Sequence, residues 1–177
     1  ALSVELSEDP VRLYLKEIGL IHLLDADSEF RLAARIEAHH RLEVLQSQTT
    51  PSVEIPGHFN ALYTSILNLM LISWEQLQQD AIRLANGAIP DFTLILTEAQ
   101  MLRAQWQADE PSYLRSLLDN GQWGKNPEWD GLVRNAFTLF LCLYLLPPEV
   151  AHPLLSGLQS GNMVLDLPYL VGRLPDE

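Results

Sequence analysis

The 177-residue sequence contains one cysteine, Cys142, so a disulfide within the chain is excluded. The absence of paired cysteines fits a reducing cytosol. Cys142 lies in the apolar run "AFTLFLCLYLL", Ala136 to Leu146, where we expect it to be a buried small hydrophobe. A membrane-spanning helix needs about 20 apolar residues. The run is too short, so we predict a core helix and no membrane partner.

Positive charge is scarce. The chain has 11 Lys and Arg against 23 Asp and Glu, a formal net charge of −12. This balance argues against broad, nonspecific adhesion to DNA or to an anionic membrane, which needs clustered cations. A small local basic site remains compatible with it. Apolar residues make up 47% of the chain and charged residues 19%, which suits a globular protein with a core.

Catalytic signatures are also missing. The sequence has no GxSxG, P-loop or CxxC motif, and no GxGxxG after a strand. A metal site could be drawn from His39 and Glu43, but two ligands are too few, and the adjacent His40 points about 100° away on a helix. We therefore predict solvated histidines, no catalytic residue, no metal, no cofactor and no enzyme activity.

The sequence also lacks alternating β-branched runs bounded by turns, so we predict an all-α fold. Asp9 and Pro10 are typical of a helix start, and Val11, Leu15 and Ile18 follow with helical spacing. Gly19 is expected just past the helix end, where a positive φ is cheap. Asp25 is expected to cap a second helix that extends to about Gln48.

The segment "QSQTTPSVEIPG", Gln46–Gly57, is polar, contains two prolines and predicts a linker. We therefore divide the chain into a helical pair, residues 1–48, and an acidic multi-helix domain, residues 49–177. Caps and apolar spacing predict six further segments, the first of which could be one helix or two: 58–86, 91–107, 111–118, 127–146, 148–158 and 167–174. The chain has no initiator methionine or signal peptide, and we expect a cytoplasmic piece of a longer protein.

Four tryptophans, Trp74, Trp106, Trp123 and Trp129, raise the question of base stacking, because aromatics interleaved with cations bind single strands. Trp74 stands beside Glu75, and Trp129 lies between Glu128 and Asp130. Acidic neighbours repel a phosphate backbone. We predict packing roles for these side chains.

Arg12 and Lys16 are one helical turn apart on the first helix. On its first two turns such cations gain nothing from the helix dipole, which favours acids there. Ion pairs with Glu8 or Glu17 on the surface would stabilise little. Two interpretations stay open at this point: a solvated helix face, or contact with phosphates or bases.

The stretch "DPVRLYLKEIGLIHLL" followed by "EFRLAARIE" resembles region 1.2 of bacterial primary sigma factors, the promoter-specificity subunits of RNA polymerase. The family pattern is approximately DPVRxYLxEIGxxxLLxxxxExxLAxRIE. The matching residues, in register without a gap, are Asp9, Pro10, Val11, Arg12, Tyr14, Leu15, Glu17, Ile18, Gly19, Leu23, Leu24, Glu29, Leu32, Ala33, Arg35, Ile36 and Glu37. Departures are Asp25 where Thr is frequent, Lys16 where Arg is common, and Ala34 where Lys is common.

The resemblance implies a function. In the family, region 1.2 contacts the non-template DNA strand just downstream of the −10 element, in the discriminator. It implies that Arg12 and Lys16 hold phosphates or base edges, while Tyr14 and Leu15 pack on a base or support the wall. It also implies that Leu24, Leu32, Ala33 and Ile36 hold the helical pair together. With Arg35, only two or three phosphates could be neutralised, so the chain alone should bind promoter DNA weakly at physiological salt.

Primary sigma factors often carry a variable acidic helical insertion between regions 1.2 and 2.1, and residues from about 50 to 177 fit that place. RNA polymerase core and promoter DNA are the implied partners, with a regulatory protein as a candidate partner of the insertion. The alternative function is a protein-interaction module that docks on core polymerase or a regulator, without direct DNA contact.

Overall fold

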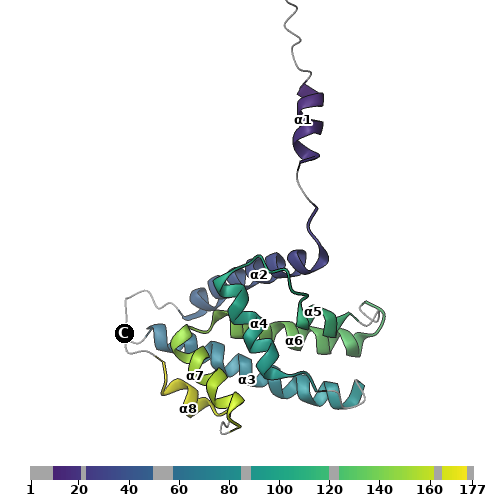
Figure 1. The fold of residues 1–177 in the computed structure, drawn as a ribbon. Coiled ribbons are helices and arrows are strands. Elements are labelled where there is room, and N and C mark those ends of the chain that lie inside the picture. Colours follow the sequence, from purple (N-terminus) through teal and green to yellow (C-terminus); the bar gives the residue numbers. More distant parts are fainter. Residues whose placement is uncertain are drawn as a thin grey trace, which may run out of the picture.

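The computed structural model describes residues 10–20, 23–49, 58–84, 89–119, 124–161 and 165–174. Within these ranges the regular structure is entirely helical, which confirms the all-α prediction (Figure 1). The helices are α1 (Pro10–Ile18), α2 (Ala26–Thr49), α3 (His58–Leu84), α4 (Phe92–Ala104), α5 (Tyr113–Leu118), α6 (Pro127–Leu145), α7 (Pro148–Gln159) and α8 (Leu167–Val171).

The core forms where α3 and α6 pack against each other, with α4 and α2 also against α6, and α8 against α3 (Figure 1). Helix α6 is apolar over most of its circumference, as expected of a helix surrounded by others. Leu139, Phe140, Leu141 and Leu143 have no exposed surface. No acidic side chain is buried in the described part of the chain. The prediction that the apolar run forms the core, with acids turned to solvent, is confirmed.

Cys142 is 1% exposed, and burial raises the pKa of its thiol to about 12. Because the thiolate is the reactive form, we expect Cys142 to resist a disulfide-exchange reagent such as Ellman's reagent in the native protein. Full labelling should appear in concentrated urea. The measurement is the rate of absorbance change with and without denaturant, and rapid labelling of the native protein would contradict the buried position.

Capping residues begin several helices where the sequence predicts them. Asp25 accepts a hydrogen bond from the Ser28 amide at 2.6 Å, which also lowers the pKa of its carboxyl group. Asp91 accepts from the Thr93 and Leu94 amides, and Asn126 from the Glu128 amide. These side chains satisfy amides that have no partner within a helix. Asp9 lies outside the described residues.

Several helix ends differ from the prediction. Helix α2 runs to Thr49, so the first four residues of the predicted linker are helical, because nothing before Pro51 interrupts it. Helix α3 is one helix and ends at Leu84. Helix α4 stops at Ala104 instead of 107, since Gln105 is extended with φ −152°.

Smaller differences occur elsewhere. Helix α5 starts after Ser112, and α8 ends at Val171. Gly19 follows α1 as predicted, but its φ is not positive. A Cβ there would lie 3.2 Å from the Leu15 carbonyl oxygen, so this position favours glycine because of a close approach.

The tryptophans pack as predicted. Trp129 is buried, and Trp74 lies edge-on against the Phe92 ring, with centroids 5.0 Å apart. Trp106 is half-buried against the core. Trp123 lies outside the described residues. Among the described helices, none alone has the length and hydropathy to cross a membrane. Helices α6 and α7 meet that criterion only together, across a bend of 119°.

Candidate nucleic-acid interface

Helix α1 buries none of its side chains and lies apart from the other helices (Figure 1). Arg12 and Lys16 occupy one stripe of it, and neither makes an ion pair with another described residue. The helix has only nine residues, so Lys16 is in its last turn. The expectation that both cations gain nothing from the helix dipole is therefore wrong for Lys16, because a cation is favoured there.

The four predicted DNA-contacting residues do not share one face of α1. At about 100° per residue, Leu15 lies roughly 60° from Arg12, whereas Tyr14 lies roughly 160° away. Tyr14 belongs to the apolar side of the helix with Val11 and Ile18, all of them exposed. One strand could reach Arg12, Lys16 and Leu15 together. The position of Tyr14 favours the supporting role of the two roles predicted for it.

The prediction that Leu24, Leu32, Ala33 and Ile36 hold the helical pair together is wrong. Leu24, Ala33 and Ile36 are exposed, Ile36 by 71%, and Leu32 is only half-buried. The reason is that α2 carries a second stripe on its other side, at helical spacing, made of Phe30, Ala34, Ala38, Leu42 and Leu45. This stripe packs on α6 and α3. Phe30 contacts the rings of Phe137 and Phe140, both with centroids 5.8 Å away.

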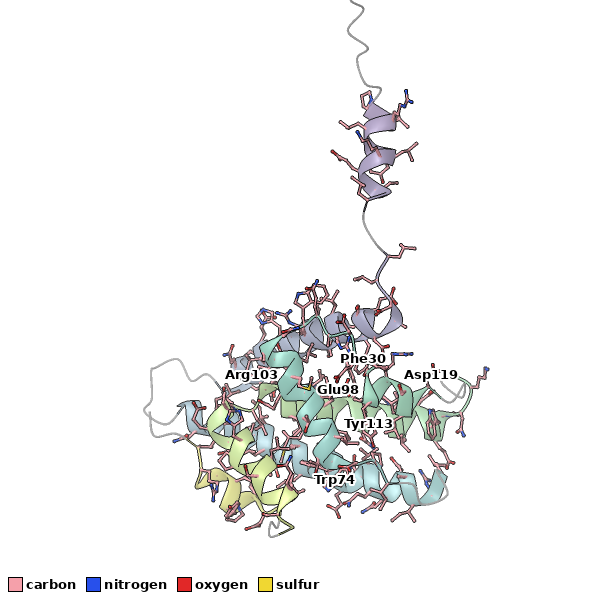
Figure 2. All side chains as sticks on the ribbon, in the orientation of Figure 1. Phe30, Trp74, Glu98, Arg103, Tyr113 and Asp119 are labelled. Atoms are coloured by element: carbon pink, nitrogen blue, oxygen red, sulfur yellow. The ribbon has the colours of Figure 1, made fainter. Side chains whose placement is uncertain are left out.

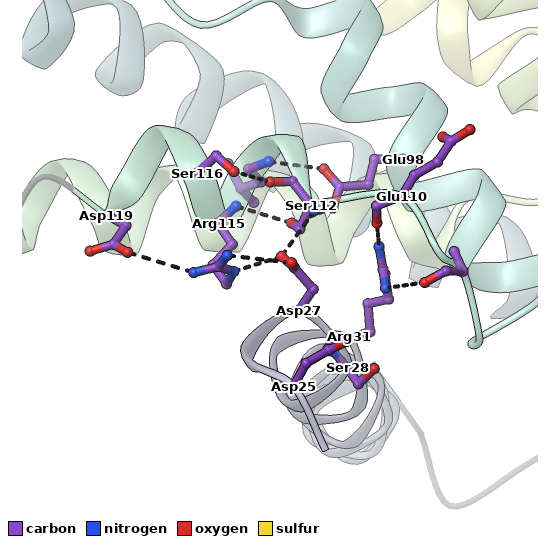
Figure 3. Close-up of polar contacts among 12 residues, drawn as sticks. Asp25, Asp27, Ser28, Arg31, Glu98, Glu110, Ser112, Arg115, Ser116 and Asp119 are labelled. Atoms are coloured by element: carbon purple, nitrogen blue, oxygen red, sulfur yellow. Dashed lines mark hydrogen bonds and ion pairs between the residues drawn. The ribbon is translucent and has the colours of Figure 1, made fainter. Parts of the chain in front are cut away.

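Polar side chains on the first two turns of α2 hold the segment before α5 (Figure 3). Asp27 accepts the Ser112 amide at 3.0 Å, the Arg115 Nε at 2.6 Å and the Arg115 Nη2 at 3.4 Å. These hydrogen bonds, above all those from Arg115, hold the pKa of the Asp27 carboxyl group below its ordinary value. The two partners are separated by 88 residues of sequence.

Arg31 extends this junction by one helical turn (Figure 3). Its guanidinium is almost fully buried and donates to the Ala108 carbonyl at 2.9 Å and to the Glu110 carbonyl. Ser112, fully buried, donates to Glu98 at 2.5 Å, and Glu98 also accepts the Leu114 amide at 2.9 Å. We call Asp27, Arg31, Glu98, Ser112 and Arg115 the α2–α5 junction. It fixes α2 on the domain that follows it.

Sequence reasoning assigned Asp27 only to the helix dipole and did not single out the other junction residues. The one local signal is the four-residue spacing of Asp27 and Arg31, which places both on one side of α2. His39 and His40 are exposed beside Glu43, with the His39 Nε2 3.4 Å from a Glu43 oxygen, so their solvated interpretation is confirmed. No group of three metal-ligating side chains occurs among the residues that the structure describes.

Residues 9–40 match the family model of sigma-70 factor, region 1.2. The chain is 70% identical over 30 residues to the RNA polymerase sigma factor SigA of Listeria monocytogenes serovar 1/2a (strain ATCC BAA-679 / EGD-e). It has the same identity to SigA of Listeria innocua serovar 6a (strain ATCC BAA-680 / CLIP 11262). The alignment covers 17% of this chain and 8% of the length of each relative. No solved structure matches the chain.

Proposed function

The chain is a sigma-factor fragment that carries region 1.2 of the sigma-70 family, and we propose that it serves promoter-specific transcription initiation by bacterial RNA polymerase. In this proposal α1 contacts the non-template strand of the discriminator through Arg12, Lys16 and Leu15, with Tyr14 supporting the wall. The chain works by binding and without catalysis. RNA polymerase core and promoter DNA are its partners, and its site of action is the cytoplasm.

One observation carries the proposal. The segment that matches region 1.2 includes a helix with no buried side chain, on which two cations without ion-pair partners in the described chain stand one turn apart. A chain of net charge −12 repels nucleic acid at long range, so contact requires such a local exception. Residues from about 50 to 177 form the insertion in this proposal, and a regulatory protein is the candidate partner of its outer surface.

The double substitution Arg12→Ala/Lys16→Ala tests the contact in an intact sigma factor assembled with polymerase. We expect the lifetime of the open complex to fall by roughly tenfold, which corresponds to about 1.4 kcal/mol, by an amount that depends on the discriminator sequence. The measurement is the decay of competitor-resistant complexes on promoters that differ only in the discriminator.

Arg134→Ala is the matched control, because it removes a cation from an exposed position of α6. It should leave the lifetime unchanged. An unchanged lifetime for the double variant on every discriminator sequence would show that α1 is a support and does not contact DNA.

A further inference from the structure

Two adjoining hollows beside α2 share Arg35 of α2 and Arg103 of α4 in their walls. The first, of about 340 Å³, also contains Trp106 and the polar Gln105 and Gln107. The second, of about 310 Å³, is bounded by Tyr63 of α3, Tyr144 of α6 and His39. Figure 2 labels Arg103 on α4, which lies close to α2 in that view.

Neither hollow has an acidic residue in its wall. This is unexpected in a chain with 23 acidic residues and 11 basic ones. Other hollows of the described surface do contain carboxylates: Asp119 in one, Glu98 and Glu110 in another, Glu37 in a third. The pair around Arg35 and Arg103 therefore attracts anions on a protein that otherwise repels them.

The two arginines are held differently. Arg103 uses Nη1 to donate to the carbonyls of Tyr144, Leu145 and Leu146, at 3.2, 3.2 and 2.6 Å. These contacts at the carboxyl end of α6 fix its position. Arg35 is exposed, and its guanidinium makes no hydrogen bond or ion pair with any described residue. Arg35 is thus available to a ligand, next to a guanidinium that is already oriented.

Aromatic side chains stand on both sides of the arginines. Trp106 lies in one hollow and Tyr144 in the other, and both are half-buried. Alternation of aromatic rings with cations is the arrangement that binds single strands, because bases stack on the rings while cations hold the phosphates. Each hollow has a volume of about 300 Å³, the lower end of small-molecule pockets, which accommodates one base.

We propose that these two hollows bind single-stranded nucleic acid, with the backbone phosphate at Arg35 and Arg103 and one base in each hollow, against Trp106 and Tyr144. The site uses no residue of α1, so it does not rest on the function proposed above. With two cations the binding is weak at physiological salt, in agreement with the overall charge of the chain.

The experiment measures the anisotropy of a fluorescein-labelled decathymidylate titrated with the 177-residue chain in about 50 mM salt. We expect Arg35→Gln to weaken binding about three- to tenfold and to reduce the slope of log K against log salt by about 0.7, the contribution of one phosphate contact on a single strand. Trp106→Leu should weaken binding about tenfold through lost stacking while leaving the salt slope unchanged.

Arg134→Gln is the matched control, since it removes the same charge from α6 outside both hollows, and it should bind like the wild type. Circular dichroism melts confirm that each variant is folded. Three results would each overturn the site: no binding by the wild type, equal losses for Arg35→Gln and Arg134→Gln, or thymidine monophosphate competing at the same concentration as the decamer.

Loss of binding in Arg12→Ala/Lys16→Ala with full binding in Arg35→Gln would also overturn it. That last outcome would leave the contact proposed for α1 intact. The two proposals therefore fail separately.

Discussion

Phe140→Ala is expected to lower the free energy of unfolding by about 3–5 kcal/mol, the range for a fully buried phenylalanine. Phe140 has no exposed surface and stands in the middle of α6. Truncation loses the transfer free energy of the ring and leaves a cavity, because close-packed neighbours relax only partly. The measurement is a urea unfolding curve followed by circular dichroism.

The effect should extend to α2, because the Phe30 ring contacts Phe140 at a centroid distance of 5.8 Å. Helix α2 includes the second half of the region 1.2 match, so that segment depends on the core of the helices that follow it. Tyr14→Ala is the matched control, an aromatic truncation on a side chain that is 61% exposed. Its unfolding free energy should stay within about 0.5 kcal/mol of the wild type. A loss that small for Phe140→Ala would contradict the central position of α6.

Helix positions were predictable because their signals are local. Asp91 and Asn126 precede apolar segments at cap positions, and their side chains accept the hydrogen bonds expected of caps. The core run of α6 was predictable for a similar reason, since it is too apolar to be exposed and too short to cross a membrane. The helix ends at 49 and 104 were less predictable, because no proline or glycine stands at either position.

The face that α2 buries was not predictable from its own sequence. The helix has apolar residues on two sides, and one side includes Ile36 of the family match. Which side is buried depends on Phe137 and Phe140, about 100 residues further along the chain. Periodicity identifies a stripe but not its partner. The same limit applies to the hollows around Arg35, whose aromatic walls come from three segments distant in sequence.

Placement on α1 followed from the family resemblance and from helix geometry together. The motif gave Arg12, Tyr14, Leu15 and Lys16 as one set, but 100° per residue separates Tyr14 from Arg12. The structure shows all four exposed or on an exposed helix. Their DNA contact stays a prediction, because a helix without buried side chains reveals what is available and not what binds.

The Asp27→Asn substitution should lower the free energy of unfolding by about 1–2 kcal/mol at pH 7, the scale of a hydrogen bond to a charged group. Asparagine keeps one oxygen for the Ser112 amide and loses the charge that pairs with Arg115. The side chains of the pair are only 20% and 30% exposed, so solvent screens them less than a surface pair. The measurement is the urea midpoint of wild type and variant at pH 7 and pH 3.

The difference between wild type and Asp27→Asn should depend on pH in one direction. The folded protein holds the pKa of Asp27 below its ordinary value of 3.8. A lowered pKa contributes stability that is fully present above that ordinary value and is lost as pH falls through the folded value. The two midpoints should therefore differ most from pH 5 upward and converge in acid. Asp109→Asn, the same substitution on an exposed residue near the junction, should change the midpoint little at either pH. A gap between wild type and Asp27→Asn that stays constant from pH 7 to pH 3 would show that the junction does not depend on the charge of Asp27, and that α2 is held there by the carbonyl contacts of Arg31 and by Phe30 alone.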